Sequence, residues 1–367
     1  METTASATNV MTESTTTTSL TNYSKKYNLK EENDPESWSY YKRQLAQRWD
    51  PEEILLSEDK DSFNQQPSRI KDLVKDLISF FAPGDGLVCE QIDHLKAETA
   101  DFAQRAFLGE QFSIEVVHAR AYKDSITTFF DEKTQIEIFE SVDTLPCVRE
   151  KADFIVKYMM NKDLPLSLRY VAAAASEGIF FVSLFAIIFV FRELKILNKF
   201  VFLNEQVAKD EKLHRDFDIL IAKRGYQNGE FSSEQAIEIL KDAFEIEKAH
   251  VFYILREYIF SKDVDELTGV TIENMHRYIA TLSDQILTGM GLPRYFSYAE
   301  RGTPTRSDNG PKQLEEISLP WLAAMSLGRK TNFYEGTPGD YSMISQKKST
   351  EEDIKNAFSC NFNDLDI

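Results

Sequence analysis

The sequence predicts an all-α fold built around one large helical bundle. Its 367 residues include only 14 Gly and 11 Pro, and 42% are hydrophobic, which favours long helices over a turn-rich sheet protein. Residues 166–192 are apolar nearly all round, as expected of a helix in the middle of a bundle. Glu115 and His118 are three residues apart, so a helix would place both on one face, where they can bind a metal ion. Bundles with such pairs on facing helices carry two-metal sites.

Two segments are expected to precede the bundle. Residues 1–24 are rich in Ser and Thr and nearly devoid of large apolar residues, so we expect a disordered tail. An extension without a defined role is favoured over a phosphorylated regulatory tail. Residues 25–66 are polar with aromatic interruptions such as Trp38 and Trp49, and we expect them to wrap the bundle as an irregular arm.

The bundle itself is expected over residues 67–290. Ser68 is the predicted N-cap of its first helix. Pro83 and Gly84 should end that helix, so Asp85 should lie at the start of the next, where an N-capping role is the alternative to metal binding. Helices are predicted over residues 68–81, 97–130, 132–140, 147–160, 166–192, 198–223, 232–260 and 264–289, as an eight-helix bundle.

The remaining chain is expected to be less regular. Residues 291–330 should elaborate the bundle, and the turn-rich stretch 301–313 should be an exposed insertion. Residues 331–367 read as a mobile tail, because they are polar with sparse apolar anchors and end on an apolar residue. Short peptides of this type bind grooves by coupled folding.

Charge and composition exclude several classes of protein. A net charge of -18 argues against nucleic acid or an anionic membrane as a partner. Cys89, Cys147 and Cys360 form no CxxC pair, which fits a reducing compartment, and we expect a cytoplasmic protein. The apolar run 178–191 is too short and too closely flanked by charge to span a bilayer, and no secretory signal or phosphate-binding glycine loop is evident.

Acidic residues followed three places later by histidine are the candidate metal ligands. With 60 acidic residues and 5 His, chance predicts about one such pair in a chain of this composition. Four occur: Glu115-x-x-His118, Glu211-x-x-His214, Glu247-x-x-His250 and Glu273-x-x-His276. Any one of them is more often a solvated helix face than a ligand pair, so the spacing alone does not choose among them.

Glu177 is the most informative single residue by chemistry. It lies within the apolar run VAAAASEGIFFVSLFAIIFVF. A carboxylate buried there, ionised and alone, would cost several kcal/mol, so it needs a partner. A metal ion supplies one, and a buried salt bridge to Arg or Lys is the alternative.

Four motifs in this chain resemble those of the small, radical-generating subunit of class I ribonucleotide reductase. They are FFAPGDG at Asp85, GEQFSIEVVHARAY at Glu115, SEGIFF at Glu177 and KDEKLH at Glu211. They occur in the family's order and at its spacings, and the likeness covers residues 49–341. The resemblance implies a ferritin-like helical bundle with a di-metal carboxylate site in a four-helix core.

The resemblance also carries the family's metal ligands onto this chain. Matched position by position, they are Asp85, Glu115, His118, Glu177, Glu211 and His214. His250 and His276 fall on later helices where the family has no ligand, so we interpret them as structural.

A radical site is implied one helical turn after His118. By resemblance, Tyr122 is the residue that is oxidised to a tyrosyl radical, and Phe181, Phe185 and Val207 surround the radical with apolar contacts. Simple core packing explains those three residues equally well.

The resemblance implies a relay of three residues for radical transfer: Trp49, Asp210 and Tyr341. Trp49 opens WDPEEILLSEDK, which resembles the family's arm; without that match, an aromatic anchored in a hydrophobic groove would be the preferred interpretation. Asp210 directly precedes Glu211, and a carboxylate commonly accepts the free ring N–H of a metal-bound histidine, here His118. Tyr341 matches the tyrosine on the family's C-terminal tail.

The implied function is that of the small subunit of ribonucleoside-diphosphate reductase. Four carboxylates and two imidazoles suit iron or manganese, so two iron ions are expected, with manganese possible. The radical would pass to a large subunit, bound through the C-terminal tail, where ribonucleoside diphosphates become deoxyribonucleoside diphosphates. A homodimer is expected because the family dimerises.

Some positions depart from the family pattern. Lys209 replaces the usual Arg, Phe154 stands where many relatives have Trp, and Gln111 suits the eukaryotic-like branch. Phe362 lies one place later than the usual tail aromatic, which puts the choice of large subunit in doubt. None of these changes removes a ligand.

Two alternative functions remain. A ferritin-like di-iron oxidase acting alone would lack a tail tyrosine and a docking peptide, so Tyr341 and the NDLDI terminus argue against it. A radical-incompetent regulatory subunit is opposed by the complete ligand set and by Tyr122.

Overall fold

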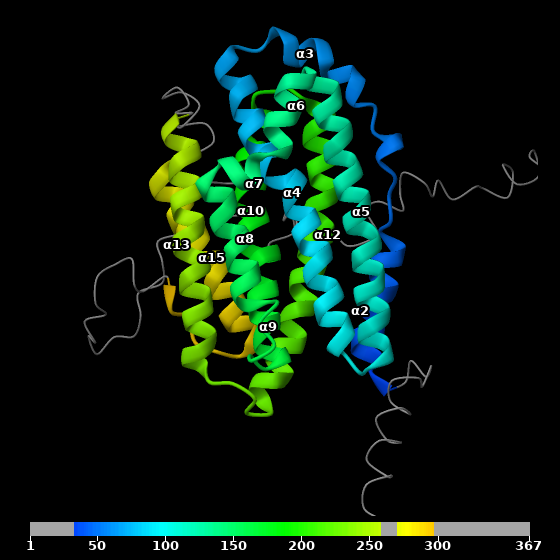
Figure 1. The fold of residues 1–367 in the computed structure, drawn as a ribbon, viewed down its shortest axis with the longest axis vertical. Helices are drawn as coiled ribbons and strands as arrows, with labels where there is room; N and C mark the ends of the chain where they lie inside the picture. Colours follow the sequence, from blue (N-terminus) through cyan, green and yellow to red (C-terminus); the bar gives the residue numbers. More distant parts are fainter. Residues whose placement is uncertain (1–32, 258–269, 297–367) are drawn as a thin grey trace, which may run out of the picture.

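Helices account for all the regular structure in the computed structural model, which describes residues 33–257 and 270–296. Figure 1 shows the longer helices running roughly along the long axis of a bundle. The all-α prediction is therefore confirmed for the described part of the chain. The predicted tails 1–24 and 331–367, the insertion 301–313 and Tyr341 lie outside it.

The helices follow one another with short connections. In chain order they are α2 (Pro35–Ala46), η2 (Pro51–Glu53), η3 (Leu56–Asp59), α3 (Lys60–Gln65), α4 (Ser68–Glu98), α5 (Phe102–Phe129), α6 (Glu132–Phe139), α7 (Ser141–Thr144), α8 (Pro146–Tyr158), α9 (Leu166–Ala175), the π-helical segment η4 (Ser176–Phe181), α10 (Val182–Ile188), α11 (Val190–Glu193), α12 (Asn198–Gln227), α13 (Ser233–Glu257) and α15 (Ile272–Met290). Most boundaries agree with the predicted ranges to within a few residues.

The N-terminal arm is more regular than predicted. Asp34 caps α2 by accepting a hydrogen bond from the backbone N–H of Ser37 at 3.0 Å, and Pro35 occupies the first helical position. Tyr40 then packs edge-on against Phe107 and Phe217. Trp38 and Tyr40 thus lie on the contact face of a helix that packs along α5, whereas Trp49 follows this helix.

The predicted break at Pro83 is wrong, because α4 continues through it to Glu98. Proline has no backbone N–H, so the carbonyl of Ser79, four residues earlier, loses its usual helical partner. The Ser141 hydroxyl donates a hydrogen bond to that carbonyl at 2.5 Å. A side chain from α7 therefore satisfies the interrupted turn, and Asp85 lies inside α4, away from the capping position that was the alternative.

The apolar run forms the centre of the bundle. The run 178–191, expected to be too short for a bilayer, belongs to the longer stretch Leu166–Glu193, which by length and composition could cross a membrane. Its most apolar window is wholly buried inside the protein. The single helix predicted there is also interrupted, because residues 176–181 wind as a π-helix. Helices α8, α12, α13 and α15 pack around the run.

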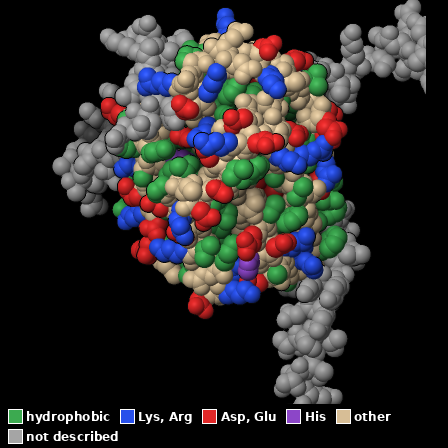
Figure 2. All heavy atoms as spheres, turned by 45° about the horizontal axis from the view of Figure 1, so that its top comes forward, with side chains coloured by type: hydrophobic (Ala, Val, Ile, Leu, Met, Phe, Trp, Pro, Cys, Tyr) green, Lys and Arg blue, Asp and Glu red, His purple; other side chains and the backbone are tan. Residues whose placement is uncertain are grey.

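Helix α12 likewise runs past its predicted end. Gly225 lies inside it, and a Cβ atom at that position would overlap the side chain of Ser167 on α9. The glycine therefore allows close packing of two core helices. At the surface, Figure 2 shows acidic, basic and hydrophobic side chains interspersed over the face in view.

Candidate metal centre

Four elements bring six buried side chains to one point inside the bundle. Asp85 comes from α4, Glu115 and His118 from α5, Glu177 from η4, and Glu211 and His214 from α12, and all six are 0% exposed. Ligand atoms of two four-residue groups lie within 4.8 Å of one another. The groups are Asp85, Glu115, His118 and Glu211, and Glu115, Glu177, Glu211 and His214. Because both contain Glu115 and Glu211, the arrangement offers two adjacent cation positions with two shared carboxylates.

The two Glu-x-x-His pairs face each other across the centre. His118 Nδ1 lies 3.1 Å from Glu115 Oε2 on its own helix and 3.2 Å from Glu211 Oε1 on the other. His214 Nδ1 lies 2.9 Å from Glu211 Oε2 and 3.0 Å from Glu115 Oε1. The three-residue spacing predicted from sequence thus places all four side chains in one cluster.

The π-helical turn carries Glu177 into the cluster. Single π-turns inside α-helices are frequent at functional sites. At the next residue, Gly178, an added Cβ would overlap the Arg215 side chain on α12, so η4 and α12 approach more closely than two larger residues would allow. Glycine at this position therefore lets η4 pack directly on the helix that supplies the second pair.

Buried oxygens without partners indicate that the cluster suits a cation. Both carboxylate oxygens of Asp85 and Oε2 of Glu177 have no hydrogen-bond partner, whereas most buried polar atoms in proteins are paired. Gln111 Nε2 donates to the other oxygen of Glu177 at 3.1 Å. Within the described ranges Glu177 makes no ion pair with Lys or Arg, which disfavours the salt-bridge alternative. Oxygen and imidazole nitrogen are the donors that iron and manganese accept.

Burial and the neighbouring charges favour bound protons in the metal-free cluster. Burial raises the pKa of Asp85 and Glu177 well above their usual values. Burial lowers the pKa of both histidines, but the neighbouring carboxylates outweigh it and raise the pKa of His118, and that of His214 to about 10. Burial tends to raise the pKa of Glu211, but the neighbouring histidines have the larger effect, so this pKa lies below its usual value. A metal ion must therefore displace protons in order to bind.

Asp210 joins the cluster to the protein surface. His118 Nε2 lies 3.0 Å from Asp210 Oδ2, and the half-buried Trp49 donates its indole N–H to the same oxygen at 2.8 Å. Gln44 and Gln47 donate to the other oxygen, Oδ1, at 2.8 and 2.7 Å. The structure thus brings together two of the three relay residues, Trp49 and Asp210, with His118. Sequence reasoning missed two further partners, Gln44 in α2 and Gln47, the residue that follows this helix.

Tyr122 is fully buried next to the cluster. Its hydroxyl donates to Asn204 Oδ1 at 3.0 Å, and the amide of Asn204 donates in turn to the backbone carbonyl of Phe200 at 2.7 Å. Burial, reinforced by the cluster carboxylates, raises the pKa of Tyr122 well above its usual value. Asn204 was not predicted, although its position seven residues before Glu211, two turns along the same helix face, could have identified it.

Aromatic rings line the tyrosine on one side. Phe81 stacks on Tyr122 with ring centroids 5.1 Å apart, and Phe185 stacks on Phe81 at 5.0 Å. Phe181 packs against Phe81 at 5.8 Å, and Val207 is completely buried. Phe181 and Phe185 therefore lie in one wall with Phe81, which is the ring that stacks on Tyr122.

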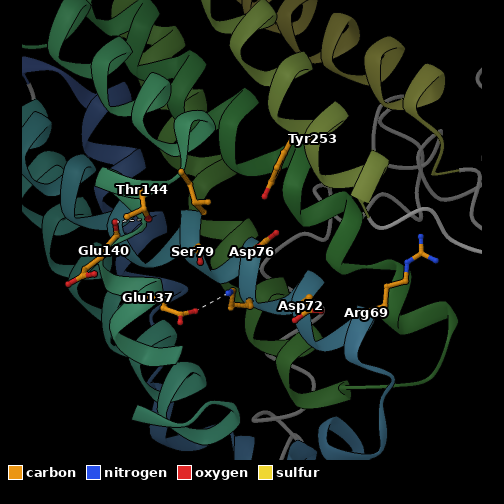
Figure 3. A pocket seen from close by; sticks show the side chains of 10 residues that line it. Arg69, Asp72, Asp76, Ser79, Glu137, Glu140, Thr144 and Tyr253 are labelled. Atoms are coloured by element: carbon orange, nitrogen blue, oxygen red, sulfur yellow. Dashed lines mark hydrogen bonds and ion pairs between the residues drawn. The ribbon is translucent and has the colours of Figure 1, made fainter. Parts of the chain in front are cut away.

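The remaining candidate pairs lie elsewhere. His250 is buried on α13, where Glu247 pairs with Lys151, and neither belongs to the cluster; His276 lies on α15. A separate surface pocket contains none of the six cluster residues (Figure 3). Its lining residues come from α4, α6, α7 and α13 and carry charges of both signs: Arg69, Asp72, Lys75, Asp76, Ser79, Glu137, Glu140, Thr144, Leu145 and Tyr253.

Comparison with known proteins gives one consistent answer. A family model described as "Ribonucleotide reductase, small chain" matches residues 26–303. A ribonucleoside-diphosphate reductase small chain from Neurospora crassa is 32% identical over 323 residues, covering 86% of this chain and 72% of that protein. The ribonucleoside-diphosphate reductase subunit M2 of Homo sapiens is 30% identical over 317 residues, covering 86% and 75%.

Solved structures share the fold. The Rnr4 homodimer of Saccharomyces cerevisiae, a ribonucleotide reductase, superimposes with a TM-score of 0.62 at 24% identity, covering 85% of this chain and 88% of that chain. The dimanganese(II)-NrdF of Streptococcus sanguinis gives a TM-score of 0.64 at 19% identity, covering 73% and 92%. At these identities the likeness concerns the bundle architecture.

Proposed function

Because this chain belongs to the ribonucleotide reductase small-chain family, we propose that it is the radical-generating small subunit of a ribonucleoside-diphosphate reductase. The observation that carries the proposal is the cluster of six buried ligand side chains directly beside the buried Tyr122. A regulatory subunit without radical chemistry would have no need of both features. We propose the assembly as a homodimer, in the cytoplasm, acting together with a large subunit.

The cluster is the proposed binding site for two iron ions, with manganese as the possible substitute. Asp85 and His118 would serve one position and Glu177 and His214 the other, with Glu115 and Glu211 shared. When bound, the metal pair supplies, with dioxygen, the oxidising power that removes an electron from Tyr122.

Residues of the chain itself prepare Tyr122 for that loss. The raised pKa keeps its phenol protonated at neutral pH, so an electron and a proton must leave together. Asn204 fixes the direction of the hydroxyl, because its own amide is held by the carbonyl of Phe200. Phe81, Phe181 and Phe185 exclude water from one side of the ring, which would protect the radical from quenching.

Transfer to the large subunit is proposed to run through Trp49 and Asp210. The hydrogen bonds from Trp49 and His118 meet on one carboxylate oxygen, so a change of charge at the indole is coupled to the imidazole through a shared proton acceptor. Tyr341 is the proposed next relay, and the C-terminal tail is the proposed docking peptide for the large subunit.

Reconstituted reductase activity tests this proposal. The protein, loaded with iron in air and mixed with a large subunit from a eukaryotic reductase, is expected to convert ribonucleoside diphosphates to deoxyribonucleoside diphosphates. Tyr122→Phe should keep the fold and the bound metal and lose the activity, because phenylalanine has no hydroxyl to oxidise. Full activity in that variant would contradict the role of Tyr122.

A further inference from the structure

A buried lysine on a neighbouring helix contacts the π-helical segment that carries Glu177. Lys151, on α8, donates from Nζ to the backbone carbonyl of Phe180 in η4 at 3.3 Å. The same ammonium lies 3.9 Å from the centroid of the Phe80 ring, a cation–π contact. Lys151 is only 1% exposed, so its ammonium group lies in the core of the bundle.

The charge of Lys151 is balanced from α13. Glu247 Oε2 lies 2.6 Å from Lys151 Nζ, and Glu247 is completely buried. The other carboxylate oxygen of Glu247 accepts a hydrogen bond from the hydroxyl of Ser183, the second residue of α10. One ion pair thus touches the chain at residue 180 and at residue 183, on both sides of the point where the π-helix returns to an α-helix.

Stability alone does not account for such a pair. Removing two charges from water costs several kcal/mol per ion, and well-packed apolar residues of similar volume are often at least as stabilising as a buried ion pair. An ion pair does differ from apolar side chains in fixing direction. Here its donors and acceptors fix one backbone carbonyl and one hydroxyl three residues apart.

We propose that Lys151 and Glu247 are positioning residues for the metal centre: together with Ser183 they hold the π-helical turn that directs Glu177 into the cluster. This inference rests on the proposed metal site. It is specific to one half of that site, because Glu177 belongs to the ligand group of His214 and not to that of His118. Phe181, which follows Phe180, would be held in the aromatic wall by the same contacts.

Calorimetric titration of the metal-free full-length chain with Mn²⁺, without oxygen, tests the proposal. The test variant is Lys151→Met with Glu247→Leu, which removes both charges and leaves neither unpaired. Glu177→Ala marks which of the two bound ions depends on Glu177. In the double variant we expect that same ion to bind about 10-fold more weakly or worse, as is usual when the support of a ligand is removed, and the other ion to bind as before.

A matched control lies on the same two helices. Lys157 on α8 and Asp242 on α13 form a partly exposed ion pair of 2.6 Å, and the further hydrogen bond to Asp242 comes from Tyr158 on α8 and not from η4. Lys157→Met with Asp242→Leu should leave both Mn²⁺ affinities unchanged. Ser183→Ala, which keeps the buried ion pair, should weaken the Glu177-dependent ion by a smaller factor, and it provides the test if the double variant does not fold.

The outcomes separate the two proposals. A parent chain that binds fewer than two Mn²⁺ ions contradicts the proposed metal site itself. Two ions in the parent and unchanged binding in the test variants would overturn the positioning role alone. Equal weakening of both ions, together with a lowered melting temperature, would show general destabilisation and would overturn it as well.

Discussion

At the scale of single residues, Asp210 has four hydrogen-bond partners on its one carboxylate. Its Oδ2 accepts hydrogen bonds from Trp49 and His118. Its Oδ1 accepts hydrogen bonds from Gln44 and Gln47, so each oxygen accepts two. An asparagine at this position would place its NH₂ group, which cannot accept hydrogen bonds, against one of these two pairs of donors. The four donors therefore require a carboxylate, and asparagine, which has the same shape, would lose hydrogen bonds here.

Asp210→Asn is accordingly expected to lower nucleotide reduction with the large subunit by about 10- to 100-fold, with the protein still folded. Asp218→Asn, at another buried aspartate of α12, is the comparison variant, because the hydrogen bonds of Trp49, Gln44 and Gln47 go to Asp210. Steady-state assays of both variants make the comparison. Equal activity of Asp210→Asn and the parent would remove Asp210 from the transfer route.

The protons of the cluster give a second prediction at this scale. His214 has a pKa raised to about 10 in the metal-free chain, so its ring is protonated at neutral pH and must lose that proton to bind a metal. Mn²⁺ affinity should therefore increase from about pH 6 to about pH 8, because releasing this proton costs less free energy as the proton concentration falls. Titration calorimetry in two buffers of different ionisation enthalpy should detect proton release. Identical heats and a pH-independent affinity would contradict it.

Much of the site was accessible from sequence at this scale, and some was not. Helical spacing made the pairs at Glu115 and Glu211 two of four candidates, because it fixes which side chains share a face, and the resemblance to the family chose them. Asn204 was accessible by the same logic. Gln44 and Gln47 could not be predicted from the sequence. Their contact with Asp210 depends on how α2 packs against α12, which local sequence patterns do not determine.

At the scale of elements, α4 depends on a hydroxyl from a neighbouring helix. Ser141 on α7 satisfies the Ser79 carbonyl that Pro83 leaves without a backbone donor. The break predicted at Pro83 followed from local rules, and a contact from 62 residues away overrides them. The π-turn at Glu177 was equally invisible, since nothing in the local sequence distinguishes it from a continuous apolar helix.

A double-mutant cycle tests the Ser141 contact. Ser141→Ala leaves a buried carbonyl without its partner and should lower the free energy of unfolding by about 1–3 kcal/mol. In a Pro83→Ala background residue 83 regains its N–H, so the same substitution should cost clearly less. Urea unfolding of the four proteins measures the coupling. Equal costs in the two backgrounds would mean that the hydroxyl does not compensate for the proline.

At the scale of the whole molecule, the apolar helical run Leu166–Glu193 decides the architecture. Its burial encloses Glu177 in the core, where six ligand side chains lie together although the chain carries a net charge of -18. The all-helical class and the central place of this run were predictable from composition and pattern. The order in which helices pack around it was available only through resemblance.

The C-terminal tail carries a prediction about assembly. Deletion of residues 361–367 should leave metal binding and the Tyr122 radical intact but abolish nucleotide reduction, because the docking peptide for the large subunit would be lost. A synthetic NFNDLDI peptide should inhibit the intact enzyme by competition. Full activity of the truncated chain would place the docking surface elsewhere.

Electron paramagnetic resonance on the protein reconstituted with ferrous iron and oxygen tests the central claim most directly. A tyrosyl signal is expected in the parent chain and none in Tyr122→Phe, with two metal ions bound in both. A parent chain that binds two ions and yields no radical, with manganese as well as with iron, would contradict the account and favour an oxidase or a regulatory subunit.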